Sequence, residues 1–187
     1  MKILAVDLDG TLIEGDTFYD TAKQLLIRSP IKLLFGLAMA FGSKNLSKMY
    51  LSKQIDIDPS KLLYNQNVID LIINHKKKGV KVVLVSGSSL LYVQKIAEYL
   101  MLFDGALGSD KKMNLTGKAK AKKLCQVYGK NGFDYVGNDF IDIEVWKHSS
   151  IAYVVTRNQR LVEMLEKIGM KYQIVDSNFV SKAKKSL

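Results

Sequence analysis

Short apolar runs that each end at a polar residue constrain the fold of this chain more than any other feature. The first run, residues 2–6 (K-I-L-A-V), is followed directly by Asp7. A continuous apolar run of this length is typical of a buried strand in a parallel sheet. Similar runs recur later in the chain, at residues 80–85 before Ser86, at residues 133–136 before Gly137 and, more weakly, at residues 151–155.

Helical patterns separate these runs. Apolar residues recur at three- and four-residue spacing in four segments, residues 68–78, 90–102, 118–128 and 157–168. Gly79 and Gly169 follow two of them, as is typical where a helix ends. Strands that alternate with helices predict an α/β fold, in which a Rossmann-like parallel sheet carries helices on both faces and right-handed crossovers join its strands.

One segment departs from this alternation. Between Gly15 and about Ser60 the pattern is helical throughout and offers no strand candidate. We interpret it as a helical insertion after the first strand. The expected organisation is therefore a core formed by residues 1–13 and 66–187, with an insertion over residues 14–65.

The length of 187 residues suits one domain with a modest insertion. The single cysteine, Cys125, excludes a disulfide framework and a thiolate zinc site, and it fits a reducing compartment. No export signal is expected, because Asp7 and Asp9 interrupt the apolar N-terminus. The longest apolar stretch, residues 33–41, is under half the ~20 residues of a spanning helix. We therefore expect a cytoplasmic protein.

The formal net charge of +10 is concentrated in two windows without acidic residues. Residues 21–55 contain six basic residues, and residues 111–133 contain seven. A phosphorylated substrate, an anionic membrane surface and a nucleic acid are the three partners that such windows suit. We expect no nucleic-acid partner, since the chain lacks a recognisable binding motif and a basic patch interleaved with aromatic residues.

The end of the first run carries residues suited to phosphate chemistry. Two carboxylates that flank one residue, Asp7 and Asp9, can divide nucleophilic attack and proton transfer between them, or can orient a metal. Gly10 allows the chain to turn sharply out of the strand, and Thr11 supplies a hydroxyl.

The other two strand ends complete this set. Ser86 with Gly87 can donate hydrogen bonds to a phosphate near the start of the next helix, and can equally cap that helix. A cluster of oxygen ligands suited to Mg²⁺ follows the third run and consists of Asn138, Asp139 and Asp142. Ligands bind at the carboxyl edge of open parallel sheets, so we expect all of these residues to meet there.

Asp7-Leu8-Asp9-Gly10-Thr11-Leu12 resembles the first motif of the haloacid dehalogenase-like (HAD) hydrolase superfamily. Ser86 resembles its second motif, and Gly137-Asn138-Asp139-Phe140-Ile141-Asp142 resembles its fourth, in the family's order. This resemblance implies that the helical insertion is a small all-helical cap over the active site.

A narrower group within the superfamily is similar in further segments. Phe103-Asp104-Gly105, Asn114-Leu115-Thr116-Gly117 and Phe133-Asp134-Tyr135 resemble the soluble HAD-like domain found alone or ahead of membrane prenyltransferases of the UbiA type. In that pattern the third-motif lysine stands three residues after Gly117, which is Lys120 here.

The resemblance also implies a role for each matching residue. Asp7 would be the nucleophile that becomes an aspartyl-phosphate, and Asp9 the general acid and base. The implied phosphate-binding residues are Thr11, Ser86, Gly87 and Lys120. The implied Mg²⁺ ligands are Asp7, Asp9 through its carbonyl, Asn138 and Asp139, with Asp142 behind them. The family's usual residue after the motif-four glycine is Asp, so the neutral Asn138 is a departure that implies weaker metal binding.

The implied activity is a Mg²⁺-dependent phosphomonoester hydrolase acting on a small or lipid-linked, prenyl-type phosphorylated substrate. Its alternative is a catalytically weak HAD-fold binding module that docks on an anionic membrane or a protein partner. The apolar run at residues 31–41 has Arg28 and Lys32 on one side and Lys44 and Lys48 on the other. It is compatible with an ordinary buried helix hairpin whose lysines extend to the surface, and equally with an interfacial element at the inner face of a membrane, which would support that alternative.

Overall fold

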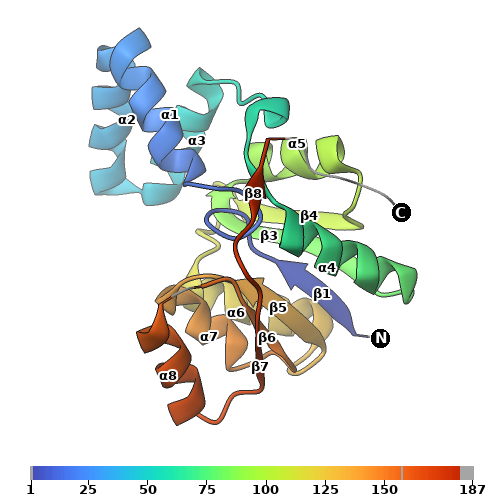
Figure 1. Cartoon of the computed structure of the whole chain (residues 1–187). Helices are drawn as coiled ribbons and strands as arrows, with labels where there is room; N and C mark the ends of the chain where they lie inside the picture. The colour runs from blue at the N-terminus through green and yellow to red at the C-terminus, as the bar shows by residue number, and fades with distance from the viewer. Residues whose placement is uncertain (1, 157, 182–187) are drawn as a thin grey trace.

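A parallel sheet forms the centre of the computed structural model, which describes residues 2–156 and 158–181 (Figure 1). Its six strands run in the order β4-β3-β1-β5-β6-β7, and every neighbouring pair is parallel. The strands are β1 (Ile3–Val6), β3 (Lys81–Ser89), β4 (Gly105–Ser109), β5 (Phe133–Gly137), β6 (Ala152–Val154) and β7 (Tyr172–Ile174).

Helices cover both faces of this sheet, which confirms the predicted Rossmann-like α/β fold. Alternate residues of β1 point to opposite faces: Leu4 and Val6 join one hydrophobic core, and Ile3 and Ala5 join the other. The helices on the first face are α4 (Gln66–Lys77) and α5 (Leu90–Leu100), and those on the second are α6 (Gly117–Tyr128), α7 (Ile143–Trp146) and α8 (Gln159–Lys167). A 3₁₀ turn, η2 (Phe140–Asp142), precedes α7.

Two strands of the sheet were not predicted from the sequence. The segment that forms β4, G-A-L-G-S, contains two glycines and no β-branched residue, so it lacks the usual strand signal. The segment that forms β7 is only three residues long, and two of these residues are exposed at the edge of the sheet. In both cases pairing with a neighbouring strand decides the conformation, and the local sequence does not show it.

Three helices form the insertion between β1 and the rest of the sheet: α1 (Thr17–Arg28), α2 (Pro30–Gly42) and α3 (Lys44–Gln54). Asp16 caps α1 by accepting hydrogen bonds from the backbone of the first turn, and Ser43 caps α3. The helices share a small core of their own, made of Leu25, Leu33, Leu51 and Ile55. They lie together at one end of the molecule, beyond the carboxyl edge of the sheet (Figure 1).

The chain rejoins the core before the end of the predicted insertion. After the 3₁₀ turn η1 (Pro59–Lys61), strand β2 (Tyr64–Asn65) pairs antiparallel with β8 (Phe179–Val180). Ile57 and Tyr64 are buried in the same hydrophobic core as α4 and α5. Of the predicted residues 14–65, therefore, only those up to Ile55 belong to the separate helical core.

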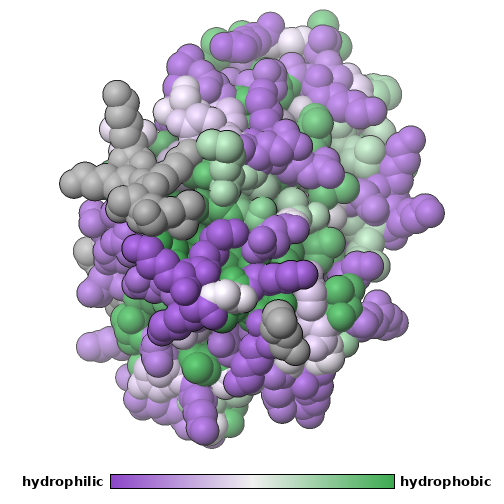
Figure 2. Space-filling view, turned by 90° about the vertical axis from the view of Figure 1, so that its right-hand side faces the viewer, coloured by the Kyte–Doolittle hydropathy of each residue, from purple (hydrophilic) through white to green (hydrophobic). Residues whose placement is uncertain are grey.

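The apolar surface is unevenly distributed. On the side of α4 and α5, hydrophilic side chains surround smaller apolar areas (Figure 2). Helix α2, by contrast, exposes a series of large apolar side chains: Ile31, Leu34, Phe35, Leu37 and Phe41. Among the residues that the structure describes, no helix has both the length and the hydropathy needed to cross a bilayer.

Candidate active site

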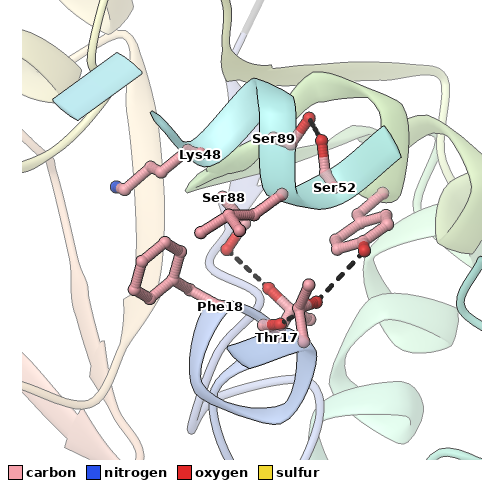
Figure 3. A pocket seen from close by; sticks show the side chains of 9 residues that line it. Thr17, Phe18, Lys48, Ser52, Ser88 and Ser89 are labelled. Carbon is pink, nitrogen blue, oxygen red and sulfur yellow. Dashed lines mark hydrogen bonds between the residues drawn. The ribbon is translucent and has the colours of Figure 1, made fainter. Parts of the chain in front are cut away.

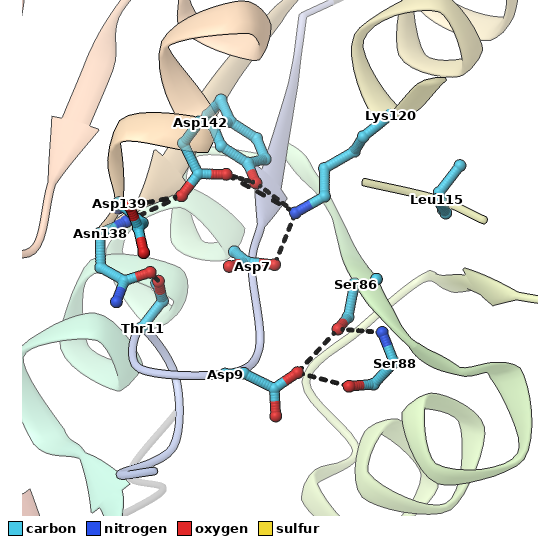
Figure 4. A network of polar contacts seen from close by, with 12 residues as sticks. Asp7, Asp9, Thr11, Ser86, Ser88, Leu115, Lys120, Asn138, Asp139 and Asp142 are labelled. Atoms are coloured by element: carbon cyan, nitrogen blue, oxygen red, sulfur yellow. Dashed lines mark hydrogen bonds and ion pairs between the residues drawn. The ribbon is translucent and has the colours of Figure 1, made fainter. Parts of the chain in front are cut away.

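Most of the residues predicted from the sequence meet at the carboxyl edge of the sheet. Asp7 follows β1 directly, Ser86 lies in β3, and Asn138 follows β5. Strands β3 and β5 are the two neighbours of β1 in the sheet. Together with Lys120 of α6 they line a cavity of about 400 Å³ (Figure 4). The other predicted residues on its wall are Asp9, Gly87, Asp139 and Asp142.

Lys120 is the centre of a buried polar network. Its ammonium donates to Asp7 Oδ1 and to the Tyr135 hydroxyl, both at 2.7 Å, and lies 3.6 Å from Asp142 Oδ1. The Tyr135 hydroxyl in turn donates to Asp142 Oδ1 at 2.7 Å. The Lys120 side chain is only 4% exposed, so its ammonium is almost completely removed from water. The carboxylates of Asp7 and Asp142 compensate its charge.

Burial and charge set the ionisation of this network. Burial raises the pKa of Asp7 to about 7, although the charge of Lys120 acts in the opposite direction. Burial alone would lower the pKa of Lys120, but the negative charges of Asp7 and Asp142 outweigh it and raise that pKa above its ordinary value. Lys120 therefore remains a cation beside Asp7.

Asp9 has different surroundings from Asp7, although only Leu8 separates them. Its Oδ2 accepts hydrogen bonds from the hydroxyls of Ser86 at 3.1 Å and Ser88 at 2.5 Å, and its Oδ1 accepts from the backbone of Thr17 at 2.8 Å. Asp7 thus faces a cation and Asp9 faces neutral donors. Two carboxylates in different environments can serve in two different steps of one reaction.

Asp142 organises the loop after β5. Its Oδ2 accepts from the backbone N–H of Asn138 at 3.1 Å and of Asp139 at 3.2 Å. Gly137 permits this approach, because a Cβ at that position would lie 2.6 Å from Asp142 Oδ2. Asp142 therefore lies behind the loop, with only 1% of its surface exposed.

Thr11 departs from its expected place. Its side chain is completely buried and donates to Asn138 Oδ1 at 3.1 Å, and it does not line the cavity. It therefore positions Asn138, and its hydroxyl is not presented to a phosphate. The turn just before Thr11 requires a glycine, because φ of Gly10 is +70° and a Cβ there would lie 2.3 Å from Asn138 Nδ2.

The oxygen donors at the cavity fit a divalent cation that keeps part of its water. Among the described residues, no three His, Cys, Asp or Glu side chains gather as a metal-binding group. The available donors are of mixed type: the second carboxylate oxygen of Asp7, the carbonyl of Asp9, the amide of Asn138 and the carboxylate of the exposed Asp139. Mg²⁺ typically binds to one or two carboxylates together with water and substrate phosphate, so this set is compatible with it.

Three site residues escaped the sequence analysis. Tyr135 lies in an apolar strand, where a tyrosine cannot be told from an ordinary core residue. Ser88 was hidden among the neighbouring polar residues of its segment, S-G-S-S. Lys48, from α3, donates to the carbonyl of Gly87 at 2.9 Å and to Asn114 Oδ1 at 3.1 Å. It was one of six basic residues in its acid-free window, and nothing in the sequence singled it out.

The model of one protein family, the haloacid dehalogenase-like hydrolases, matches residues 4–134 of this chain. The uncharacterized protein y4nM of Sinorhizobium fredii is 29% identical over 168 residues, which cover 90% of this chain. The chain spans only 32% of the length of that relative.

Solved structures share the fold. A protein of unknown function from Bordetella pertussis Tohama I aligns with a TM-score of 0.68 at 13% identity, over 92% of this chain and 98% of that one. Phosphoserine phosphatase aligns in a substrate-bound complex and as a phospho-aspartyl intermediate analogue, with TM-scores of 0.57 and 0.56 and identities of 18% and 20%. Each of these two alignments covers 89% of this chain and 98% of the other.

Proposed function

The chain belongs to the haloacid dehalogenase-like hydrolase family, and we propose that it is a Mg²⁺-dependent phosphomonoester hydrolase that acts through an aspartyl-phosphate on Asp7. One observation carries this proposal: Asp7 and Asp9 open onto the same cavity in contrasting environments, one paired with Lys120 and the other held by hydroxyls. The fold of phosphoserine phosphatase, also captured as a phospho-aspartyl analogue, supports it.

In the first half of the proposed reaction, the free carboxylate oxygen of Asp7 attacks phosphorus. Lys120 holds the other oxygen at 2.7 Å, which fixes the orientation of the nucleophile. A bond forms between Asp7 and phosphorus while the bond to the leaving oxygen breaks, and protonated Asp9 donates its proton to that oxygen. The alcohol is the first product.

In the second half, Asp9 accepts a proton from water as the water oxygen bonds to the phosphorus of the aspartyl-phosphate. The bond between phosphorus and Asp7 breaks, which frees the Asp7 carboxylate and releases inorganic phosphate. Ser86, Gly87 and Lys120 would hold the phosphoryl oxygens. Asp7, the Asp9 carbonyl, Asn138 and Asp139 would hold Mg²⁺, with Asp142 positioning the last two through their backbone N–H groups. When bound, the cation offsets the repulsion between the anionic nucleophile and the anionic phosphate.

Hydrolysis of p-nitrophenyl phosphate with Mg²⁺ or with a chelator tests this proposal. We expect Mg²⁺-dependent turnover in the wild type and a loss of about 10³-fold or more in Asp7→Asn. Asp70→Asn, on the exposed surface of α4, is the matched control and should keep wild-type turnover. Wild-type turnover in Asp7→Asn would overturn the proposal. If the wild type is active and Asp7→Asn is not, a screen of small phosphorylated metabolites and prenyl phosphates identifies the substrate class.

A second candidate function, docking on an anionic membrane surface, is favoured by α2. Phe41 is 98% exposed and Ile31 is 80% exposed. The six basic residues of the acid-free window, residues 21–55, surround this apolar surface in the sequence. Exposed apolar residues with basic neighbours suit the interface of an anionic leaflet. This surface would suit a cytoplasmic protein at the inner face of a membrane.

Co-sedimentation with vesicles tests the docking. We expect binding to vesicles that contain phosphatidylglycerol, weaker binding to pure phosphatidylcholine, and loss of binding in the variant Ile31→Ser/Phe41→Ser. The control is Val127→Ser, which changes an exposed apolar residue of α6. If the wild type does not bind the anionic vesicles, the docking function is excluded and the hydrolase proposal is unaffected.

A further inference from the structure

Lys48 is the only one of the six basic residues in the acid-free window, residues 21–55, that is not exposed. The other five, Lys23, Arg28, Lys32, Lys44 and Lys53, are exposed, whereas Lys48 is half-buried. Its side chain extends from α3 to the core, where it contacts Gly87 and Asn114 and lines the same cavity as Asp7. In Figure 3 its ammonium points away from the hydroxyls of Thr17, Ser52 and Ser88.

The charge of Lys48 lacks a direct counterion among the described residues. Both of its hydrogen-bond acceptors are neutral oxygens, and no carboxylate of those residues forms an ion pair with it. Lys120, in contrast, has two carboxylate partners. Burial lowers the pKa of Lys48, although Asp16 and Asp9 act in the opposite direction. A partly desolvated cation on a cavity wall is a favourable place for an anionic ligand.

Contacts at the base of α3 hold Lys48 in this position. Ser52, one turn further along the helix, donates to Ser89 Oγ at 2.9 Å (Figure 3). The bond to the carbonyl of Gly87 joins Lys48 to the residue that follows Ser86. The ammonium is therefore fixed beside the expected phosphate site, while its stem belongs to the helical insertion.

The direction of attack shows which part of a substrate would meet this wall. In phosphoryl transfer the attacking and leaving oxygens lie roughly in line across phosphorus. Asp7 attacks from the edge of the sheet, so the leaving group points away from the sheet, toward the helical insertion. The lining residues that the insertion and its entry loop supply are Gly15, Asp16, Phe18 and Lys48.

We propose that Lys48 is a specificity-determining residue that binds a second anionic group, a carboxylate or a phosphate, on the leaving-group side of a compact phosphomonoester. This proposal rests on the proposed hydrolase function and adds the substrate class to it. Phe18 supplies the nearby apolar surface for the carbon skeleton between the two anionic groups.

A matched pair of substrates tests the proposal. 3-Phosphoglycerate and glycerol 3-phosphate share a three-carbon skeleton and a phosphate, but only the first carries a carboxylate. We expect the wild type to prefer 3-phosphoglycerate in kcat/KM by about ten-fold or more, as one charge-assisted hydrogen bond predicts. Lys48→Met should remove this preference by lowering kcat/KM for 3-phosphoglycerate to about the value for glycerol 3-phosphate. Fructose 1,6-bisphosphate against fructose 6-phosphate shows whether a second phosphate replaces the carboxylate.

Two control variants separate specificity from structure. Lys53→Met, an exposed lysine of the same helix, should keep the preference, and Lys48→Arg should retain most of it because the positive charge remains. An equal loss on all substrates in Lys48→Met, or the absence of any preference in an active wild type, would overturn the proposal. Failure of the hydrolase function itself would look different, since the wild type would then hydrolyse none of these compounds.

Discussion

The sheet edge and the helical insertion differ in how they hold their polar residues. At the sheet edge, Asp7, Lys120, Tyr135 and Asp142 form a closed network in which charges compensate one another. The insertion contacts the core through separate polar contacts, which include the hydroxyl pairs Thr17–Ser88 and Ser52–Ser89 and the bonds from Lys48 to Gly87 and Asn114. The polar groups of the edge are therefore held in one connected network of charges, whereas the contacts of the insertion lie apart from one another.

The two regions also differ in their hydrophobic cores. Two extensive clusters pack against the faces of the sheet, whereas the core of the insertion consists of four buried residues. A region with few buried contacts opens locally at a lower free energy than the rest of the molecule. This difference suits the two proposed roles, in which the residues of the sheet edge carry out the reaction and the insertion selects the substrate.

The largest effect is expected from Lys120→Met. It leaves Asp7 and Asp142 buried without their cation, so we expect the free energy of unfolding to fall by about 3–5 kcal/mol and turnover to be lost. Chemical denaturation measures the first quantity. Lys122→Met is the control, since it lies on the same helix with an exposed side chain. Wild-type stability in Lys120→Met would show that the network is not what holds the sheet edge together.

Tyr135→Phe tests whether the network acts as a unit. The change removes only the hydroxyl that joins Lys120 to Asp142, and bonds to charged groups contribute about 1.5–3 kcal/mol. We expect a loss of stability in that range together with a measurable drop in kcat. A double-mutant cycle with Asp142→Asn should show strong coupling. Additive effects would mean that the two residues act independently.

Gly36→Ala tests the core of the insertion. A Cβ at this position would lie 2.3 Å from Leu51 Cδ2 and 2.7 Å from its Cγ, so either the buried Leu51 side chain must shift or α2 and α3 must move apart. Overpacking of this kind costs about 1–3 kcal/mol. Hydrogen exchange should then speed up in α1–α3 and stay unchanged in β1, β3 and β5. In the control, Gly42→Ala, no atom lies within 4 Å of the new Cβ. Uniform acceleration across the chain would show that the insertion and the sheet unfold together.

The sequence predicted the sheet edge better than the insertion, for a physical reason. The residues of the edge follow apolar strands directly, and parallel strands bring their carboxyl ends together whatever the loops do. Asp7, Ser86 and Asn138 were therefore found from position alone. Tyr135 was missed because no local sequence pattern shows the bonds of its hydroxyl to Lys120 and Asp142, and its strand looks like ordinary core. Thr11 was assigned to phosphate because its hydroxyl was visible in the sequence while its contact with Asn138 was not.

The insertion left more undetermined. Its helices were evident from periodicity, but six basic residues shared one window, and only the packing of α3 against the core selects Lys48 among them. The return to the core at β2 was also missed, because its pairing with β8 joins segments more than 100 residues apart. Contacts between segments distant in sequence decide both the position of Lys48 and the pairing of β2, and no local sequence pattern predicts such contacts.

The smallest effect is expected where the insertion meets the core, at Ser52 and Ser89. Their hydroxyls lie 2.9 Å apart in a buried position. Ser52→Ala and Ser89→Ala should each cost about 0.5–1.5 kcal/mol in local opening of α3, measured by hydrogen exchange. The double variant should cost less than the sum, because the second change removes a group that has already lost its partner. If either single change instead lowered the stability of the whole chain as much as Lys120→Met, the contact would belong to the rigid part of the molecule. The proposed division between a fixed sheet edge and a more loosely held insertion would then be wrong.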